Sequence, residues 1–433
     1  MERFALSRMK EWKENENRKP LIIRGARQVG KTWIMKTFGQ QYFEKTAYVN
    51  FDNNARMKQV FEGDLDIERL VLSISAETGV SIEAENTLII FDEVQEVPKA
   101  LTSLKYFHEN APQYAIVAAG SLLGVALHQG TSFPVGKVDF LDLYPLNFRE
   151  FLCAMGEKQF VSMLDSCDTQ MVTVFKTKYI ERLREYYFVG GMPEVVKDFS
   201  EKKDYNRVRV IQKNLINYYQ QDFSKHAEIK LVPRLNLVWN SIPMQLAKEN
   251  KKYIYGQVRE GSRAKDFELA IQWLLDCGLI HKVQRIQKPD LPLKAYIDFD
   301  AFKLFLVDIG LLIAMTDLDA KVIIEGNKIF TEYKGSLTEQ YILQQLISDV
   351  GVIPYYYSTQ NSKGEIDFLV QGKTSVIPIE VKAEENLKAK SLKAFCEKYQ
   401  PSYAVRTSMS DYREQDWMTN IPLYAIKWIE NYV

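Results

Sequence analysis

The segment from Leu21 to Trp33, LIIRGARQVGKTW, constrains the fold of this chain more than any other. It sets the pattern G-x-x-x-x-G-K-T between a short apolar run typical of a buried strand and the helical stretch KTWIMKTFG, which Gly39 closes. Glycines let successive backbone N–H groups turn toward phosphate oxygens at a helix N-terminus, whose dipole favours anions. Because a strand and a helix flank the loop, a chance glycine turn is the weaker interpretation. The segment therefore predicts a nucleotide-binding P-loop domain.

The loop and the first helical turn supply the residues expected to bind ATP. Lys31 is expected to reach the β- and γ-phosphates, and the Thr32 hydroxyl is expected to ligate Mg²⁺. The full set of expected ATP-binding residues is Gly25, Ala26, Arg27, Gln28, Val29, Gly30, Lys31, Thr32 and Trp33.

A second segment, NTLIIFDEVQEVP, adds two carboxylates to this predicted site. Its four apolar residues, Leu88 to Phe91, predict a buried parallel strand with acids at its C-terminal tip. We expect Asp92 to hold Mg²⁺ through water and Glu93 to act as the catalytic residue that polarises the attacking water. Adjacent acids after a strand could also form an ordinary solvated loop. The phosphate loop upstream makes hydrolysis the better interpretation.

A third apolar strand, YAIVAAGS, ends on Ser121, which we expect to sense the γ-phosphate. Strands that alternate with helices in this way predict an α/β domain with a doubly wound parallel sheet and the nucleotide at the strand C-termini. A small-molecule kinase would share the phosphate loop. The Asp-Glu pair and the polar-tipped strand favour an ATPase instead.

Composition limits the other function classes. The 433 residues suffice for two to four domains, and the 56 basic residues equal the 56 acidic ones, which argues against a constitutive nucleic-acid coat. The four cysteines form no C-x-x-C pair, so structural zinc is not expected. The charged start lacks the apolar core of a signal peptide, and the longest apolar-rich run, Ala115 to Leu127, is too short to cross a bilayer. These features predict a soluble, cytoplasmic protein with no membrane partner.

The middle of the chain, residues 156–300, is predicted to be helical and to include a winged-helix-like segment. Residues 232–285 give the order helix, turn, helix and short strand. Arg259, Arg263 and Lys265 lie near the start of the expected second helix, where basic side chains could contact DNA phosphates. An ordinary solvated face is the alternative, and the balanced overall charge favours it.

The segment GEIDFLVQGKTSVIPIEVKA, residues 364–383, predicts a β-hairpin that turns at QGKT. Pairing Phe368 with Ile377 puts Ile366, Phe368 and Val370 on one apolar face, because side chains alternate along a strand. Pro378 is the awkward residue, since proline removes a ladder donor and prefers an edge or a bulge.

The opposite face of this hairpin would carry Glu365, Asp367, Glu380 and Lys382. The spacing is that of the Asp…Glu-x-Lys signature of restriction-type nucleases, PD-(D/E)xK. In such sites the two carboxylates bind Mg²⁺ and the lysine helps activate water. A solvated face of an edge hairpin is the alternative interpretation.

The order of several motifs resembles a widespread prokaryotic family of ATP-binding proteins that join an N-terminal AAA-type ATPase domain to a C-terminal domain of unassigned role. The segments that carry the resemblance are RGARQVGKT, IIFDEVQEVP, GSLLG, LYPLNFREF, YFVGGMPEVV, LVDIGLL and KGSLTEQYI. The resemblance implies ATP binding and hydrolysis, a winged-helix-like segment and a restriction-nuclease-like module. It also implies that Glu339, in the helix before the hairpin, lies where that fold often supplies a further acid.

One position departs from that family. Its members usually carry Gly-Arg just before the LYPL segment, and this chain carries Gly136 and Lys137. Lysine cannot form the bidentate fork of a guanidinium on phosphate. If the family arginine completes an active site, we expect the lysine to slow turnover.

Taken together, the sequence predicts three parts: an AAA-type ATPase domain (residues 1–155), a helical and winged-helix-like region (156–300) and a restriction-nuclease-like domain (301–433). The predicted function is a Mg²⁺-dependent ATPase whose nucleotide cycle controls a nuclease-like module that acts on or binds DNA or RNA. The alternative is a non-catalytic, ATP-dependent switch whose C-terminal module only binds a protein or nucleic-acid partner. A homo-oligomer is compatible with both.

Overall fold

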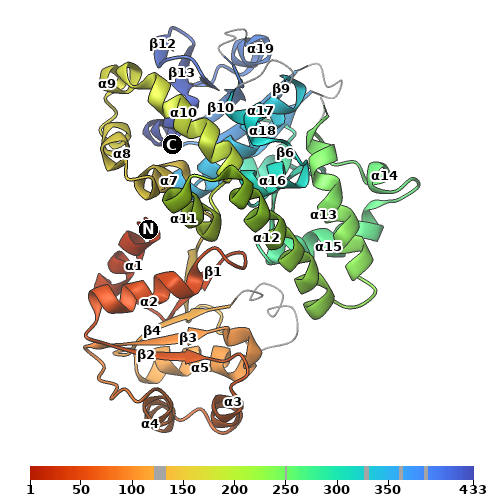
Figure 1. The fold of residues 1–433 in the computed structure, drawn as a ribbon. Helices are drawn as coiled ribbons and strands as arrows, with labels where there is room; N and C mark the ends of the chain where they lie inside the picture. The colour runs from red at the N-terminus through yellow and green to blue at the C-terminus, as the bar shows by residue number, and fades with distance from the viewer. Residues whose placement is uncertain (121–132, 249–250, 326–330, 360–363, 385–388) are drawn as a thin grey trace. The chain divides into compact units, whose positions relative to one another are not determined.

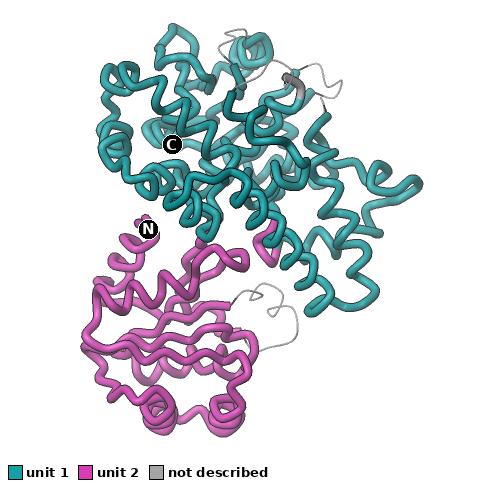
Figure 2. The backbone as a smooth tube through the Cα atoms, in the orientation of Figure 1, with its two compact units in different colours: residues 1, 145–275, 280–433 teal, residues 2–144, 276–279 magenta. Residues whose placement is uncertain are grey.

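The computed structural model describes residues 1–120, 133–248, 251–325, 331–359, 364–384 and 389–433 (Figure 1). The chain divides into two compact units, one of residues 2–144 and 276–279 and one of residues 1, 145–275 and 280–433 (Figure 2). Among the described helices, none combines the length and the apolar composition that a membrane span requires.

The first unit is built on a five-stranded sheet in the order β2-β3-β4-β1-β5, and all of its strand pairs are parallel. The strands are β1 (Leu21–Arg24), β2 (Lys45–Asn50), β3 (Thr87–Asp92), β4 (Ala115–Ala119) and β5 (Asp139–Asp142). Every residue of β3 and β4 is buried, as expected for central parallel strands with helices on both faces. The predicted α/β fold with a parallel sheet is confirmed.

Helices cover both faces of this sheet (Figure 1). They are α1 (Ala5–Glu14), α2 (Lys31–Tyr42), α3 (Ala55–Glu62), α4 (Ile67–Thr78), the 3₁₀ turn η1 (Val94–Glu96) and α5 (Pro98–Asn110). Apolar residues of α3, α4 and α5 form one core with the sheet, centred on the mutually edge-on rings of Phe51, Phe61 and Phe91. Helices α1 and α2 pack together through Trp12 and Phe38. The sheet is thus fixed on both sides, which holds the loops at its edge.

The second unit begins with a run of helices. These are α7 (Phe148–Ala154), α8 (Lys158–Asp165), α9 (Thr169–Val174), α10 (Lys176–Val189), α11 (Pro193–Lys202), α12 (Tyr205–His226), α13 (Val232–Leu246), α14 (Tyr255–Val258) and α15 (Ala264–Asp276). Residues 232–285 form α13, α14, α15 and β6, so a four-residue helix lies where the sequence predicted a turn. Strand β6 pairs with β7 in an antiparallel hairpin.

The rest of this unit surrounds an eight-stranded mixed sheet in the order β12-β13-β11-β10-β9-β8-β6-β7. The strands are β6 (Ile280–Ile286), β7 (Ile297–Leu306), β8 (Tyr355–Ser358), β9 (Glu365–Gln371), β10 (Val376–Val381), β11 (Val405–Ser408), β12 (Arg413–Gln415) and β13 (Met418–Pro422). The other elements are η2 (Leu293–Tyr296), α16 (Ile309–Met315), α17 (Ala320–Ile324), α18 (Thr331–Gln345), the π-helix η4 (Leu346–Val350), α19 (Lys390–Tyr399) and η5 (Leu423–Tyr432). The expected boundary between residues 300 and 301 falls inside β7.

Two of the segments that carry the family resemblance pack against each other inside this unit. Asp308 of LVDIGLL accepts hydrogen bonds from the backbone N–H of Gly191 (2.6 Å), in YFVGGMPEVV, and from that of Leu311 (3.1 Å). Gln344 of α18 donates a third, at 3.3 Å. Burial raises the pKa of the Asp308 carboxyl to about 6, against the opposing effect of these donors. The two motifs therefore have a structural role in joining α10, α16 and α18.

Candidate functional site

The phosphate loop lies between β1 and α2, as the sequence predicted. Gly25 has a φ of 146°, and a Cβ at this position would lie 2.1 Å from the Leu143 carbonyl oxygen, so only glycine fits. Gly30 has a φ of 96° and caps the N-terminus of α2. These two residues let the loop turn its backbone toward the helix N-terminus, where an anion is favoured.

Lys31, the first residue of α2, is buried beneath this loop. Its ammonium group donates hydrogen bonds to the carbonyl oxygens of Gly25 and Ala26, each at 2.8 Å. Burial lowers the pKa of Lys31 to about 8, partly offset by the nearby carboxylates of Glu93 and Asp92. A phosphate would give this cation a stronger partner than two neutral carbonyl groups.

Thr32 and Asp92 meet where the sequence placed the Mg²⁺ site. The Thr32 hydroxyl donates to Asp92 Oδ2 at 2.7 Å, and the phenol of Tyr48, on β2, donates to the same oxygen at 2.9 Å. Burial and the Asp92 charge raise the pKa of Tyr48 far above neutrality, so the phenol remains a donor. A hydroxyl beside a carboxylate is a hard-oxygen donor set that suits Mg²⁺.

Glu93 follows directly, at the C-terminal tip of β3. Its backbone is left-handed, with a φ of 50°, which ends the extended strand. The Gln95 amide donates to Glu93 Oε2 at 2.7 Å. The backbone N–H of Glu93 donates to Asp92 Oδ1 at 3.1 Å, so Glu93 is tied to the same carboxylate that accepts from Thr32.

The remaining predicted nucleotide residues differ in exposure. Ala26 and Val29 are buried under the loop, whereas Arg27 and Trp33 are exposed. Gln28 adopts a φ of 66°, a turn conformation within the loop. Ser121, the predicted γ-phosphate sensor, lies outside the described residues.

Lys137 lies at the N-terminal ends of the strands, and the phosphate loop lies at their C-terminal ends. Lys137 precedes β5, which runs parallel to β1, whereas the loop follows the carboxyl end of β1. Its ammonium pairs with Glu109 of α5 at 2.9 Å and lowers the pKa of that carboxyl. Lys137 therefore does not reach a nucleotide bound by the same domain.

The C-terminal hairpin forms, but its predicted register is wrong. Phe368 pairs with Ile379 rather than Ile377, because the turn begins at Gly372, whose N–H donates to the Ser375 carbonyl at 2.9 Å. A shift of two residues would preserve the faces. Pro378 is accommodated because β11 joins β10 only from Ile379 onward.

A β-bulge in β9 changes the faces. Tyr355 pairs with Leu369 but Tyr357 pairs with Ile366, so one extra residue of β9 interrupts the alternation. Ile366 packs in the same cluster as Leu369, and Phe368 instead contacts Phe305 with ring centroids 6.2 Å apart. The prediction that Ile366 and Phe368 share one face is therefore wrong. The contacts of the charged residues accordingly fall into two sets.

Glu380 and Lys382 form the first set. Their side chains pair at 2.6 Å, and Glu380 Oε2 accepts the backbone N–H of Leu392 at 3.0 Å. Leu392 is in the first turn of α19, so Glu380 satisfies one of the free donors at that helix N-terminus. This contact gives Glu380 a structural role.

The second set is a group that we call the lysine–carboxylate cluster, in which Lys303 and Glu339 are buried and the other members are half-buried. It consists of Lys251, Lys303, Glu339, Glu365 and Asp367. Lys303 pairs with Glu365 and lies 3.7 Å from Glu339, while Lys251 pairs with Glu339. Asp367 Oδ2 accepts the backbone N–H of Val381 at 2.7 Å. The charges of the cluster thus compensate one another inside the protein.

The pKa values within this cluster shift in opposite directions. Burial, reinforced by the Glu339 charge, raises the pKa of Asp367 to about 8. Burial alone would lower the pKa of Lys303, but the carboxylates of Glu339 and Glu365 raise it overall. The two lysines in turn lower the pKa of Glu339 despite its burial. Among the described residues, no group of three or more His, Cys, Asp or Glu side chains is placed to hold a metal ion.

Sequence reasoning missed Tyr48 and Lys303. Tyr48 gives no local signal, because its contact with Asp92 depends on β2 lying beside β3. Lys303 does give a local signal, because it is the single charged residue in the otherwise apolar segment AFKLFLV. Such a residue is buried only with a charged partner.

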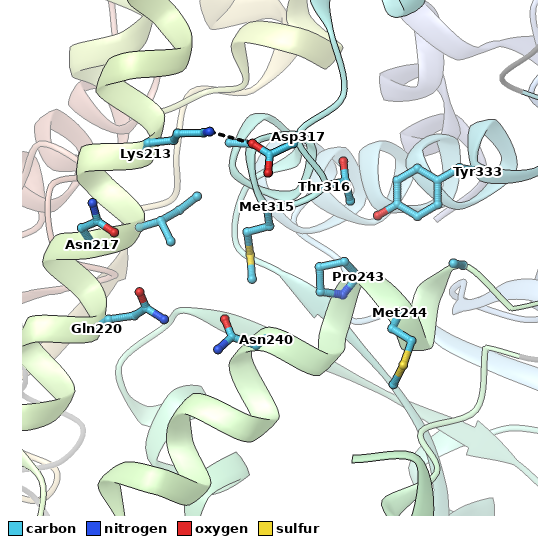
Figure 3. A pocket seen from close by; sticks show the side chains of 13 residues that line it. Lys213, Asn217, Gln220, Asn240, Pro243, Met244, Met315, Thr316, Asp317 and Tyr333 are labelled. Atoms are coloured by element: carbon cyan, nitrogen blue, oxygen red, sulfur yellow. Dashed lines mark ion pairs between the residues drawn. The ribbon is translucent and has the colours of Figure 1, made fainter. Parts of the chain in front are cut away.

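A separate cavity of about 640 Å³ lies between α12, α13, the end of α16 and the start of α18 (Figure 3). The amides of Asn217 and Gln220 and the thioether of Met315 line it, beside the Lys213–Asp317 ion pair at 2.7 Å. No predicted site residue is part of its lining.

Family comparisons divide the chain into three matched segments. Residues 17–152 match a family described as an AAA domain. Residues 180–322 and 334–426 match two families described as domains of unknown function, DUF8612 and DUF4143. The N-terminal part is therefore an AAA-type P-loop domain. A comparison with curated proteins gives no match.

Some solved structures are similar at low identity. The Walker-type ATPase PABY2304 of Pyrococcus abyssi is 14% identical with a TM-score of 0.44, over 73% of this chain and 95% of that one. The Aeropyrum pernix ORC1 protein, solved in complex with DNA, is 13% identical with a TM-score of 0.27, over 72% and 91%. Cdc6p from Pyrobaculum aerophilum is 10% identical with a TM-score of 0.25, over 74% and 93%.

Proposed function

We propose that this chain is a Mg²⁺-dependent ATP hydrolase and that its nucleotide state acts as a switch on a C-terminal binding module. The observation that carries the first half is the contact of the Thr32 hydroxyl with Asp92 Oδ2 at 2.7 Å, directly before Glu93 and beneath the phosphate loop. The loop N–H groups and Lys31 would bind the phosphate oxygens. Thr32 and Asp92 would hold Mg²⁺, which when bound neutralises negative charge on the phosphates. Glu93 would take a proton from the attacking water.

The test of this half measures binding and turnover separately. Wild-type protein should bind ATP in calorimetry and release phosphate in the presence of Mg²⁺. Lys31→Ala should lose binding, because it removes the buried cation beneath the loop that would bind the phosphates. Arg18→Ala, a change at a cation on the loop that precedes β1, is the matched control. Binding without phosphate release by the wild type would leave a nucleotide-dependent switch and refute hydrolysis.

The second part of the proposal, the C-terminal binding module, concerns residues 145–433. The restriction-nuclease-like interpretation needs Asp367 and Glu380 to bind a metal together, with Glu339 and Lys382 nearby. Each carboxylate instead contacts protein donors, which supports a module that binds DNA, RNA or protein rather than one that cleaves. The winged-helix-like region is part of this proposal.

Cleavage and binding can be distinguished directly. Labelled DNA and RNA should remain intact on incubation with the protein and Mg²⁺, with or without ATP. A nucleic-acid partner would then show as a mobility shift that depends on ATP, and the absence of any shift would favour a protein partner. Cleavage that Asp367→Ala abolishes would overturn the binding interpretation.

A further inference from the structure

We propose that Lys303 is an internal cation that occupies the place of a divalent metal ion among Glu339, Glu365 and Asp367. The wild-type module would then not bind metal at these carboxylates. This inference deepens the C-terminal half of the proposed function, and it depends on no step of ATP hydrolysis.

The position of Lys303 is the first argument. It lies on β7, and its side chain is 0% exposed. Its ammonium contacts Glu365 and lies 3.7 Å from Glu339 Oε2 and 4.8 Å from the centre of the Tyr356 ring. The buried cation is therefore held among two carboxylates and one aromatic face.

The carboxylate groups of the cluster already have partners within the protein. Glu339 Oε1 pairs with Lys251, and Asp367 Oδ2 accepts the Val381 N–H at 2.7 Å. Glu339 Oε2 accepts no hydrogen bond from the described residues, so the charge of Lys303, 3.7 Å away, is what compensates it. Two ammonium groups thus face three carboxyl groups, so at most one negative charge is left uncompensated. Mg²⁺ and Mn²⁺ need oxygen ligands that are free to coordinate, and a buried excess of positive charge is strongly unfavourable. The metal and the lysine therefore exclude each other.

The experiment titrates Mn²⁺ into nucleotide-free, full-length protein and follows free Mn²⁺ by electron paramagnetic resonance. Lys303→Met keeps the length of the side chain and removes its charge. We expect this variant to gain one Mn²⁺ site per chain that binds at least about ten-fold tighter than anything in the wild type. Adding Glu339→Gln to Lys303→Met should remove the new site.

Lys282→Met is the matched control. Lys282 lies on the neighbouring strand β6, over the ring of Phe302 at 4.3 Å, away from the carboxylates. Its loss should leave Mn²⁺ binding as in the wild type. Any weak binding at the phosphate loop is common to all these proteins and cancels in the comparison.

Two results would overturn the inference. The first is a Mn²⁺ site in the wild type that Glu339→Gln abolishes. The second is a folded Lys303→Met protein that binds no additional Mn²⁺. If Lys303→Met does not fold in buffer, its thermal unfolding in millimolar Mn²⁺ decides: recovery of the folded protein supports the inference, and no recovery contradicts it.

Discussion

Two buried lysines make the most instructive comparison in this molecule. Lys31 is held by the carbonyl oxygens of Gly25 and Ala26, and its pKa is lowered to about 8. Lys303 is held by the carboxylates of Glu339 and Glu365, and its pKa is raised. Burial pushes both pKa values down, so the partners decide the sign of the net shift.

The difference separates a site from a structural pair. A lysine whose hydrogen bonds go to neutral carbonyl groups carries a charge that an incoming anion can compensate, as phosphate would at Lys31. A lysine already compensated by two carboxylates gains nothing from an anion and blocks a cation. Complete motifs in a sequence therefore do not establish a site, because the fold decides which charges are left for a ligand.

The largest expected effect tests whether the Lys31 region is catalytic. Glu93→Gln should lower ATP turnover by about 10²–10⁴-fold, because the amide cannot take a proton from water. ATP affinity should stay within about two-fold, since the amide keeps the size of the side chain and Lys31 remains to bind the phosphates. Steady-state phosphate release and calorimetry measure the two quantities. Equal turnover by the variant and the wild type would remove Glu93 from this role.

The next prediction compares how the two lysines contribute to the unfolding free energy of the nucleotide-free protein. Lys303→Met should lower the unfolding free energy by about 3–5 kcal/mol, because it leaves buried carboxylates without a partner. Lys31→Met should leave it unchanged or raise it, because that ammonium is desolvated without a carboxylate contact. Urea titrations followed by circular dichroism give both values. A similar loss of unfolding free energy in both variants would show that the two lysines do not differ in the way their partners stabilise them.

The sequence predicted the first region far better than the second, for a physical reason. The phosphate loop is defined within one segment, where glycine conformation and residue order suffice. The lysine–carboxylate cluster combines a loop, strand β7, helix α18 and strand β9, and a bulge in β9 decides which side chains meet. A bulge reflects the pairing of β9 with β8, which the hairpin sequence does not contain. The lone charge at Lys303 was the one local signal.

A pH dependence sharpens the description of the cluster. The folded-state pKa of Asp367, about 8, lies above its ordinary value of about 3.9, so the folded state holds its proton over a wider pH range. Its stabilising contribution is complete below about pH 4 and is lost as the pH rises through about 8. The Asp367 contribution to the unfolding free energy should fall by about 2 kcal/mol between about pH 6.5 and 9, whereas Lys31, whose pKa is lowered to about 8, titrates in the same window with the opposite sign.

Asp367→Asn should remove this contribution, because an amide does not titrate, so the unfolding free energy of the wild type relative to the variant should fall with pH while the Lys31 effect cancels. The window excludes most of the effect of Asp308, whose pKa is about 6. Denaturant titrations at four pH values would show it. The same slope in both proteins would mean that Asp367 is ionised in the folded protein.

A smaller effect is expected at the nucleotide site from Tyr48→Phe. The change removes the hydrogen bond to Asp92 Oδ2 and keeps the ring that packs under Lys36, 3.8 Å from its centre. Turnover should fall about ten-fold, in line with the loss of one hydrogen bond to a charged group. The Mg²⁺ concentration at half-maximal rate should rise, and ATP affinity without Mg²⁺ should not change. Tyr42→Phe, on α2, is the control. A loss of ATP affinity instead would indicate a packing defect.

The smallest effect is expected at Lys137, and it tests the reach of the first site. Lys137 is half-exposed, pairs with Glu109, and lies at the N-terminal ends of the strands, away from the phosphate loop. Lys137→Arg and Lys137→Ala should both keep turnover within about two-fold, because an exposed ion pair contributes little. The expectation that this lysine slows turnover would then be refuted for a single copy. If Lys137→Ala instead loses activity, and the loss depends on protein concentration, the residue acts on nucleotide bound by a second copy of the chain. The first site would then be completed between copies, whereas the lysine–carboxylate cluster is complete within one.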